Sequence, residues 1–458
     1  MITKQKMHLK RRTKISFILL LALFAARCTK DQSKTSVQKT TTPTTPSATT
    51  VASSANQITY TNNNPTDNSK NLQALIANNV TIYFPKGTYN FTNFVSINNN
   101  NTIHIYAAPG TVFQSSIDKI FEISGQTSDI EINNISFVST KSSSVNDTEG
   151  IIFIANYGAT DVMNNINIHN CKFSNPNTLC DAIKLVSEGT NSLAKNITIT
   201  LDTFKSVGRF GVELQNNNYT PMVARFTNYN INNNNFQDVG TIQSGPASSC
   251  VSVTGYGLNG VIDNNYFLNM RMNTTSNVYY GIENAGTVNL ETKGNTFVSN
   301  TYGFTGLLGS GPTLAESIAR NQPLKTNWVI ENNTFNLIGS TTDKTKIRAM
   351  DLGDTYNYFI ENNNMNTDGQ CIRFSNCQNG IVSSNIMTTN FGNALYFQDG
   401  STKNKVTSNT ITSKGPDQGT VFFDGASTNT NYAFGNTLTK ANGVTGDYRN
   451  YDGAYNNF

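Results

Sequence analysis

Three acidic residues occupy matching positions of a repeating pattern in this 458-residue chain: Glu213, Glu283 and Asp351. Charged residues make up only 14% of the sequence, so three acids in register are a signal for chemistry. Two carboxyl groups placed on either side of a bond can act as general acid and general base. We therefore take Glu213 and Glu283 as the candidate acid–base pair, with Asp351 as a substitute partner.

The spacing of these carboxyl groups bears on the reaction that they would support. In glycosidases, about 5–5.5 Å suits direct nucleophilic attack, and about 6.5–9.5 Å leaves room for an activated water. If each repeat is one coil of a stacked structure, neighbouring coils lie about 4.8 Å apart. Glu213 and Glu283 would then be two coils apart, or about 9–10 Å, which favours inverting hydrolysis.

Basic and aromatic residues accompany the acids. Elimination from a uronate needs cations that neutralise the substrate carboxylate and a base that removes the α-proton, so the same positions also fit a lyase. The candidate substrate-binding residues are Lys184, Arg209, Arg271, Tyr279, Tyr280, Arg373 and Tyr396. The plainer alternative is a solvated face on which neighbours such as Lys184 and Glu213 form ion pairs of small energetic value.

A repeat marked by asparagine must position these residues. Asn recurs two residues before an apolar residue, mostly Phe, at intervals of 31, 30, 38, 30, 22, 24 and 27 residues. The eight ladder positions are Asn234, Asn265, Asn295, Asn333, Asn363, Asn385, Asn409 and Asn436. A second apolar residue usually lies five positions before the first, a spacing that cannot share one face of an unbroken strand. A bend must intervene, and Asn tolerates the left-handed conformation of a tight bend. This repeat predicts an all-β, right-handed parallel β-helix solenoid.

Each predicted coil has a third strand, and alternation along it directs the candidate residues to one side. In Phe210–Gln215, for example, Val212 and Leu214 face the core while Glu213 faces outward. Aligning the coils gives an outward column of Lys184, Glu213, Ser252, Glu283, a residue near Thr305, Asp351, Arg373 and Tyr396. Long insertions at 237–249, 268–280 and 309–327 flank its middle, and such loops on a regular scaffold are typical of a cleft.

The start of the solenoid carries a second pattern. Asp67 is expected to cap a short helix through Asn78, which would cover the open N-terminal end of the stack. A strand containing the sequence FPKGTY follows. Together with the Asn ladder, this entry resembles the pectin-lyase-like superfamily of right-handed parallel β-helices over roughly residues 57–440. The resemblance implies the fold and leaves the reaction open, because the superfamily includes lyases, hydrolases, epimerases and phage tailspikes.

The first 27 residues are typical of an export signal, with a basic start and an apolar stretch too short to span a bilayer comfortably. Ala25, Ala26 and Arg27 precede Cys28; the two alanines resemble the small residues of a bacterial lipoprotein processing site, from which Arg27 departs, and we expect a lipidated Cys28. We expect a Ser/Thr/Pro tether over 28–56, an N-terminal cap and first coils over 57–131, the β-helix over 132–440 and a tail over 441–458. Without the signal the net charge falls from +4 to 26 − 29 = −3. Nucleic-acid binding is therefore not expected, and membrane contact is expected only through the lipid anchor.

Histidine and cysteine provide no further site. Outside the signal only His104 and His169 remain, and the cysteines after Cys28 lack metal-site spacing. We expect no cofactor or metal, calcium not being indicated, and the oligomeric state stays open. The sequence favours an exported enzyme that cleaves an extended, uronate-containing or neutral polysaccharide by hydrolysis or β-elimination. The alternative is a non-catalytic surface protein that binds glycans or acts as an adhesin.

Overall fold

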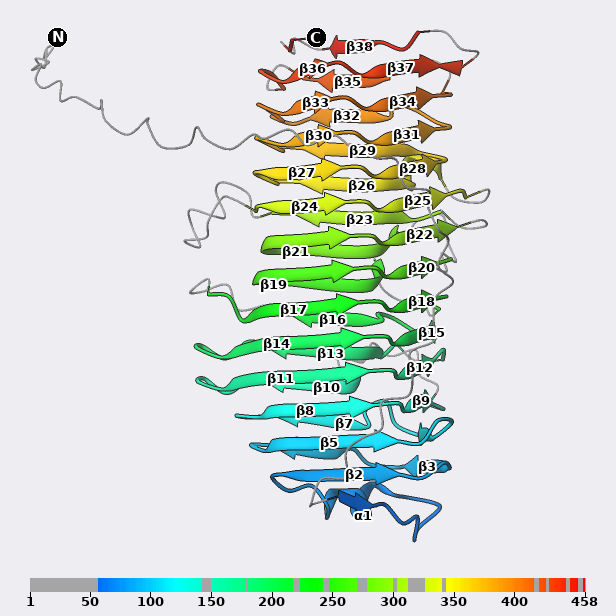
Figure 1. Ribbon diagram of the computed structural model, residues 1–458, viewed down its shortest axis with the longest axis vertical. Helices are drawn as coiled ribbons and strands as arrows, with labels where there is room; N and C mark the ends of the chain where they lie inside the picture. The colour runs from blue at the N-terminus through cyan, green and yellow to red at the C-terminus, as the bar shows by residue number, and fades with distance from the viewer. Residues whose placement is uncertain are drawn as a thin grey trace, which may run out of the picture. The chain divides into compact units, whose positions relative to one another are not determined.

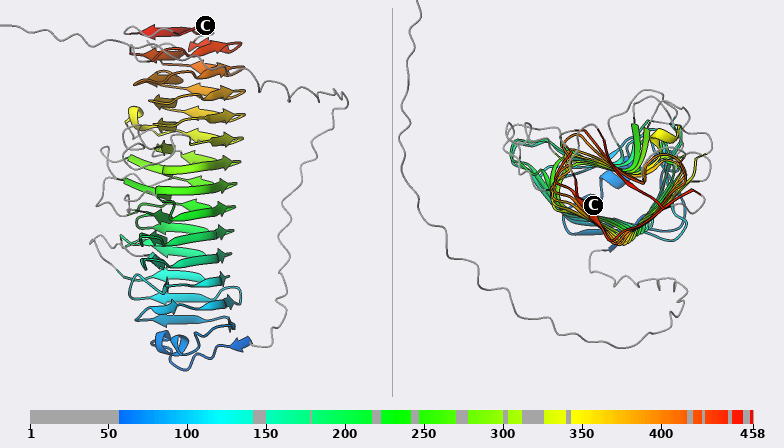
Figure 2. Two further views of the ribbon diagram at one scale, coloured as in Figure 1. Left: turned by 90° about the vertical axis from the view of Figure 1, so that its left-hand side faces the viewer. Right: turned by 90° about the horizontal axis from the view of Figure 1, so that it is seen from above.

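The computed structural model describes residues 57–141, 150–177, 179–216, 223–241, 247–269, 278–299, 303–311, 326–339, 343–415, 420–425, 428–441, 445–451 and 456–457. These residues belong to one compact unit, Ser53–Phe458, in which short strands stack coil upon coil (Figure 1). The expected signal, Cys28 and the tether lie outside the described residues. All pairings between the strands are parallel, in one sheet of 25 strands and one of 13. The fold is the expected right-handed parallel β-helix, and the view along its axis shows the coils superimposed (Figure 2).

Each coil contributes a strand to each of three faces, which we number in chain order. Face 1 consists of β1 (Gln57–Thr59), β2 (Val80–Phe84), β5 (Asn101–Ala107), β8 (Ser128–Asn133), β11 (Val162–His169), β14 (Leu193–Thr200), β17 (Phe226–Asn232), β24 (Trp328–Glu331), β27 (Tyr358–Glu361), β30 (Ile381–Ser383), β33 (Lys405–Thr407) and β36 (Tyr432–Phe434). Face 2 consists of β3 (Thr88–Phe91), β6 (Val112–Ser115), β9 (Ser136–Ser139), β12 (Lys172–Asn175), β15 (Thr203–Val207), β18 (Asn235–Gln237), β20 (Tyr266–Leu268), β22 (Thr296–Ser299), β25 (Thr334–Leu337), β28 (Asn364–Thr367), β31 (Ile386–Thr389), β34 (Thr410–Ser413) and β37 (Thr437–Lys440).

Face 3 carries the strands that were expected to hold the candidate site. It consists of β4 (Val95–Asn98), β7 (Phe121–Ser124), β10 (Gly150–Asn156), β13 (Asp181–Ser187), β16 (Val212–Gln215), β23 (Thr305–Ser310), β26 (Arg348–Gly353), β29 (Gln370–Ser375), β32 (Leu395–Gln398), β35 (Val421–Asp424) and β38 (Tyr448–Tyr451). β19 (Ala247–Asp263) and β21 (Val278–Lys293) run from face 3 into face 1 of the next coil. β38 lies in the range expected to be a tail, and it pairs with β35 as one more coil strand.

Phenylalanine rings fill the interior behind face 2. The rings of seven successive coils stack with centroids 4.5 to 5.1 Å apart, because parallel in-register pairing places identical residues directly over one another. The stack consists of Phe137, Phe173, Phe204, Phe236, Phe267, Phe297 and Phe335. These rings are at most 2% exposed, so they form the spine of the core.

The asparagine ladder is confirmed, with one correction to the bend. At each step the side-chain Oδ1 of one ladder Asn accepts two bonds from the Asn of the preceding coil, the backbone N–H at 2.9 Å and Nδ2 at 2.9 to 3.1 Å. The left-handed residue is the one before the ladder position, for example Asn233 with φ 55° and Asn264 with φ 55°. The ladder residue is therefore selected for its amide group, and its predecessor for conformational tolerance.

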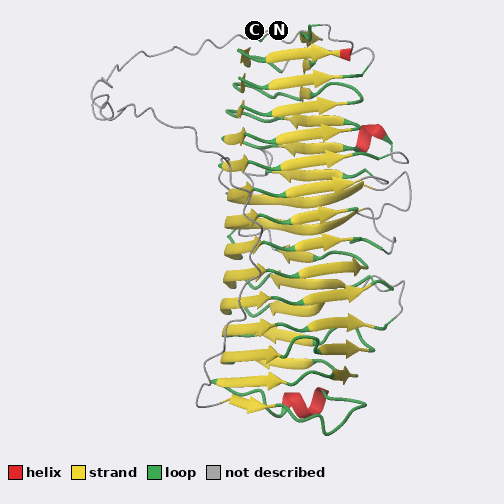
Figure 3. Ribbon diagram, turned by 45° about the vertical axis from the view of Figure 1, so that its right-hand side comes forward, coloured by secondary structure: helices red, strands yellow, loops and turns green. Residues whose placement is uncertain are grey.

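A short helix, α1 (Ser69–Gln73), lies at the N-terminal end of the stack (Figure 3). It is shorter than the helix expected through Asn78. Asp67 Oδ1 accepts bonds from the backbone N–H of Ser69 at 3.0 Å and from its hydroxyl at 2.6 Å. Leu72 is fully buried against the core, so the helix covers the first coil as expected. Among the described residues, no helix is long and apolar enough to cross a membrane.

Candidate active site on face 3

The register of face 3 places the candidate residues in one column. Each pairs with the next across neighbouring coils, in the order Lys184, Glu213, Ser252, Glu283, Leu308, Asp351, Arg373 and Tyr396. The predicted column is confirmed, with Leu308 in place of a residue near Thr305. The neighbours Val212 and Leu214 are fully buried in the core, so Glu213 projects from the opposite side of its strand.

At the N-terminal end of the column, Glu213 lies in a dense cluster of charges. Its Oε2 is 2.7 Å from Lys184 Nζ and 2.9 Å from Arg209 NH2. Arg209 Nε is also 3.2 Å from Oδ1 of Asp181, a fully buried carboxyl that the sequence analysis did not identify. The side chains of Glu213 and Lys184 are only 5% and 4% exposed, so this is an enclosed ion pair and not a solvated one.

The pKa values of the two carboxyl groups in this cluster are shifted in opposite directions. Burial, followed by the neighbouring Glu213 charge, raises the pKa of Asp181 well above its ordinary value. Burial opposes ionisation of Glu213 as well, but Arg209 and Lys184 outweigh it and lower the pKa of Glu213. The pKa values of these two neighbouring carboxyl groups are thus shifted apart.

Glu283 has a different environment from Glu213. Its Oε2 accepts hydrogen bonds from the hydroxyls of Ser249 at 3.1 Å and Ser252 at 3.0 Å. Burial raises the pKa of Glu283, the two hydroxyls oppose the shift only in part, and the charge of Glu213 adds to it. The adjacent Tyr280 has its pKa raised to about 12 by burial and by the charges of Glu283 and Asp351.

Toward the C-terminal end, Asp351 is held by two arginines. Arg373 donates from Nε to Oδ1 at 2.8 Å and from NH2 to Oδ2 at 2.7 Å, which is a bidentate pair. Arg348 adds a bond from NH1 to Oδ2 at 3.1 Å. A cavity of about 370 Å³ opens beside both arginines, and its lining includes Lys344, Gln370, Tyr396 and Phe422. The Tyr396 hydroxyl donates to Asp424.

One aromatic candidate is wrong, and one basic candidate lies outside the described part of the chain. Tyr279 is only 2% exposed and belongs to the hydrophobic core. Strict alternation from Glu283 would place Tyr279 on the column side, but the alternation is interrupted at Gly281, where a Cβ would meet the core ring of Phe297 at 2.7 Å. The only tryptophan, Trp328, is also fully buried, and its Nε1 donates to the carbonyl of Thr287 at 2.8 Å. Arg271 lies outside the described residues.

The column gives the spacing between the two candidate glutamates. Glu213 and Glu283 lie two coil steps apart, with only Ser252 between them in the column. At about 4.8 Å per step the backbone separation is about 9–10 Å, close to the range that leaves room for a water molecule. Among the described residues, no group of three or more His, Cys, Asp or Glu side chains could hold a metal ion. The five described cysteines are buried thiols without disulfides.

Comparison with known proteins supports the fold. No protein-family model and no curated protein sequence matches the chain. The catalytic unit of the thermostable GH87 α-1,3-glucanase from Streptomyces thermodiastaticus strain HF3-3 has a TM-score of 0.50 at 14% identity, covering 88% of this chain and 69% of that chain. The A-module of the Azotobacter vinelandii mannuronan C-5 epimerase AlgE6 has a TM-score of 0.46 at 13% identity, covering 85% and 95%. PfbA, a surface adhesin of Streptococcus pneumoniae, has a TM-score of 0.47 at 15% identity, covering 82% and 90%. At 14% identity the similarity to the glucanase catalytic unit shows the fold alone, which is the right-handed parallel β-helix that the sequence predicted.

Proposed function

We propose that this protein is an exported enzyme that cleaves an extended polysaccharide lying along the face 3 column. One observation carries the proposal: two acids of one column, two coils apart, have pKa values shifted in opposite directions. The pKa of Glu283 is raised and that of Glu213 is lowered. A pair of titratable groups whose environments separate their pKa values is what acid–base catalysis requires.

In this mechanism Glu283 is the general acid. Its proton passes to the glycosidic oxygen as the bond from that oxygen to the anomeric carbon breaks. Glu213 is the general base, which takes a proton from a water whose oxygen bonds to the anomeric carbon from the opposite face. Lys184 and Arg209 favour the ionised form of Glu213, and Arg209 is itself held by Asp181. The separation of the two carboxyl groups favours inversion.

A second reaction, β-elimination from a uronate, is favoured by the cationic end of the column. Arg348 and Arg373 beside the cavity would neutralise a substrate carboxylate and so acidify the adjacent C–H bond. Tyr280 lies within the field of both arginines and of Glu283. In this case Glu283 removes the α-proton, and Tyr280, whose pKa of about 12 keeps its phenol protonated, supplies the leaving oxygen with a proton.

Export and anchoring form a further part of the proposal. The basic and apolar start of the chain, with Ala25 and Ala26 shortly before Cys28, supports an outer-membrane or cell-surface lipoprotein. Detergent-phase partitioning of the full chain beside Cys28→Ser tests the anchor: equal partitioning of both would refute it. The GH87 glucanase neighbour acts on a glycan with this fold, and a glycan-binding adhesin would keep the solenoid without needing the opposed acids.

The test is turnover of a panel of neutral and uronate polysaccharides by the purified chain. Reducing ends alone indicate hydrolysis, and reducing ends with absorbance of unsaturated uronate indicate elimination. Glu283→Gln should lower turnover by about 10²–10⁴-fold, the usual contribution of a general acid or base. Glu361→Gln is the matched control, since Glu361 also accepts a serine hydroxyl, from Ser383 at 2.6 Å, but lies on face 1. Equal turnover in both variants, or binding without any product, would refute the proposal.

A further inference from the structure

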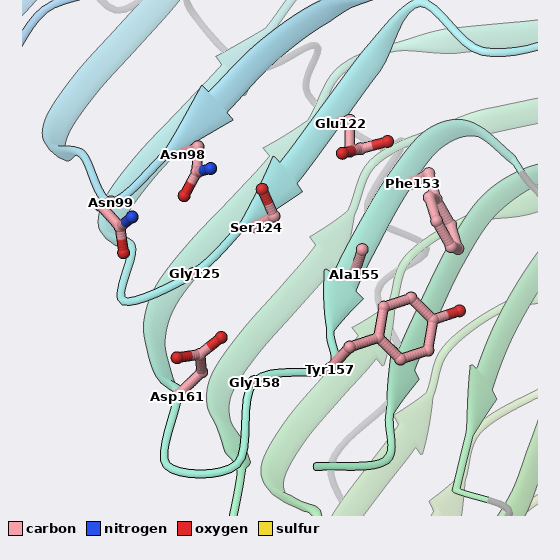
Figure 4. Close-up of a pocket in the computed structure, with 10 residues that line it drawn as sticks. All are labelled: Asn98, Asn99, Glu122, Ser124, Gly125, Phe153, Ala155, Tyr157, Gly158 and Asp161. Atoms are coloured by element: carbon pink, nitrogen blue, oxygen red, sulfur yellow. The ribbon is translucent and has the colours of Figure 1, made fainter.

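A second cavity, of about 510 Å³, lies at the N-terminal end of face 3. Its lining includes Glu122 and Phe153, and the register joins Glu122 to Phe153 and Phe153 to Lys184. Ser124 and Ala155 form the floor, two positions along the same strands (Figure 4). The cavity thus continues the column that carries the candidate acids. Three coil steps of about 4.8 Å place Glu122 about 14 Å from Glu213.

One wall of the cavity is aromatic. The Tyr157 side chain is 53% exposed, and its ring centroid lies 6.4 Å from that of the buried Phe153. Figure 4 shows these rings on one side and Asn98, Asn99 and Asp161 on the other. An aromatic wall facing amide and carboxylate groups suits a ligand with one apolar face and a rim of hydroxyls, since amides donate and accept while carboxylates only accept.

Glycine leaves room for the polar groups that line the cavity. A Cβ built on Gly125, whose φ is 69°, would lie 2.4 Å from Oδ1 of Asn99 and 2.6 Å from Oδ1 of Asn98. A Cβ on Gly158 would lie 2.1 Å from Oδ2 of Asp161. Any other residue at either position would displace these oxygens, so the shape of this wall depends on the two glycines.

The charge of this cavity is opposite to that of the cavity near Asp351. Its lining holds two carboxyl groups, Glu122 and Asp161, and no basic side chain. Lys119, beside the cavity, is paired with Glu122 at 2.5 Å, and its Nζ lies over the Phe153 ring at 5.4 Å from the centroid. The lining of the C-terminal cavity contains Lys344, Arg348 and Arg373 and no carboxyl group. A uronate would meet a like charge at Asp161 and would compete with Glu122 for Lys119, whereas a neutral sugar would do neither.

We infer that the Tyr157 cavity is a distal subsite for a neutral sugar of the polysaccharide. The inference rests on the proposed function, because it extends the same bound chain over three coils beyond Glu213. A pyranose ring lies against Tyr157, and its hydroxyls donate to Glu122 and Asp161. The volume falls within the range of small-molecule sites, roughly 300–1,000 Å³. The substrate is therefore a long glycan that presents uncharged residues at this end of the column.

Calorimetric binding tests the inference, with the full chain carrying Glu283→Gln so that ligands persist. The probes are short and long oligosaccharides of glucose, mannose and galactose, and of galacturonate and mannuronate. Tyr157→Ala should weaken the binding of long neutral oligosaccharides about tenfold, and Asp161→Asn by a similar factor. Short oligosaccharides, which do not reach the cavity, should keep their affinity. Tyr266→Ala is the matched control, because Tyr266 is a 38% exposed tyrosine on face 2.

Two results would overturn the subsite. One is that Tyr157→Ala matches Tyr266→Ala for every probe, and the other is that calcium alone binds in a manner abolished by Asp161→Asn. Failure of the proposed function has a different signature, namely no turnover by the unmodified chain, or turnover that survives Glu283→Gln. Length-dependent binding lost in Tyr157→Ala would support the subsite even then, as part of a glycan-binding face.

Discussion

Replacing Ser252 with alanine should shift the pH dependence of catalysis in a direction that reveals the role of Glu283. The Ser252 hydroxyl donates to Glu283 Oε2 at 3.0 Å and helps to offset the effect of burial. A hydrogen bond to a charged group contributes about 1.5–3 kcal/mol, and one pKa unit corresponds to about 1.4 kcal/mol. Ser249 still donates to the same oxygen at 3.1 Å and compensates in part. We therefore expect the pKa of Glu283 to rise by about one unit.

The sign of the resulting change distinguishes the two mechanisms. A general acid must be protonated, so activity is lost as pH rises through its pKa. With Glu283 as the acid, Ser252→Ala moves the alkaline limb of the kcat/KM profile upward by about one pH unit. With Glu283 as the base of an elimination, the acidic limb moves upward instead and activity is lost at low pH.

The assay is kcat/KM against pH on the polysaccharide identified by the panel. Ser248→Ala is the control, because Ser248 is a buried serine of the same strand with no hydrogen bond to Glu283 among those found in the described residues. A profile of Ser252→Ala that overlays that of Ser248→Ala would refute the assignment of Glu283 to acid–base chemistry. A shift of the acidic limb would refute its role as the acid in hydrolysis.

Two further predictions concern the asparagine ladder. Asn295→Ala should lower the free energy of unfolding, measured by urea titration, by about 3 kcal/mol, because it leaves a buried backbone N–H and a buried carbonyl without their hydrogen-bond partner. The control is Asn336→Ala, which removes one exposed side-chain hydrogen bond and should cost under about 0.5 kcal/mol in the same titration. Equal losses would contradict the ladder's energetic role. Asp202→Asn should stabilise the fold by about 1–2 kcal/mol at pH 7 and by less at pH 4. Burial raises the pKa of Asp202 in the folded state, so the unmodified protein becomes less stable as pH rises above the pKa of this aspartate in the unfolded chain, whereas an asparagine does not titrate. A variant that is no more stable than the unmodified protein at pH 7 would contradict this reasoning.

The column could be predicted because alternation and repeat spacing are both written in the sequence. The ladder asparagines allow the sequences of successive coils to be aligned. The alternation of side chains along each strand then places Glu213, Glu283 and Asp351 on one side. The coil that contributes Leu308 is harder to place from the sequence, because Gly309 occupies the interior position that Leu352 holds in the next coil. Neither the fold nor the column required any information about the loops.

The parts of the site that the sequence did not predict depend on side-chain packing. Asp181 lies three residues before Lys184, so simple alternation places it on the opposite side, yet Arg209 and Glu213 meet it at the start of the strand. Tyr279 and Tyr280 are consecutive residues at the end of a long insertion, where it is hardest to assign from the sequence which side chain enters the core. The opposed pKa values of Glu213 and Glu283 come from burial and partners, which are visible only in three dimensions.

The stacking of whole coils sets how this site can change over evolutionary time. The gap between its two acids is a whole number of turns of the solenoid, so duplication or loss of one turn would alter it by about 4.8 Å while the spine of rings closed up again. Smaller changes in the distance between the two carboxyl groups then depend on side-chain length, as in an exchange of aspartate for glutamate. In a scaffold of this kind, the distance between groups that contact a polymer changes in discrete increments of one coil.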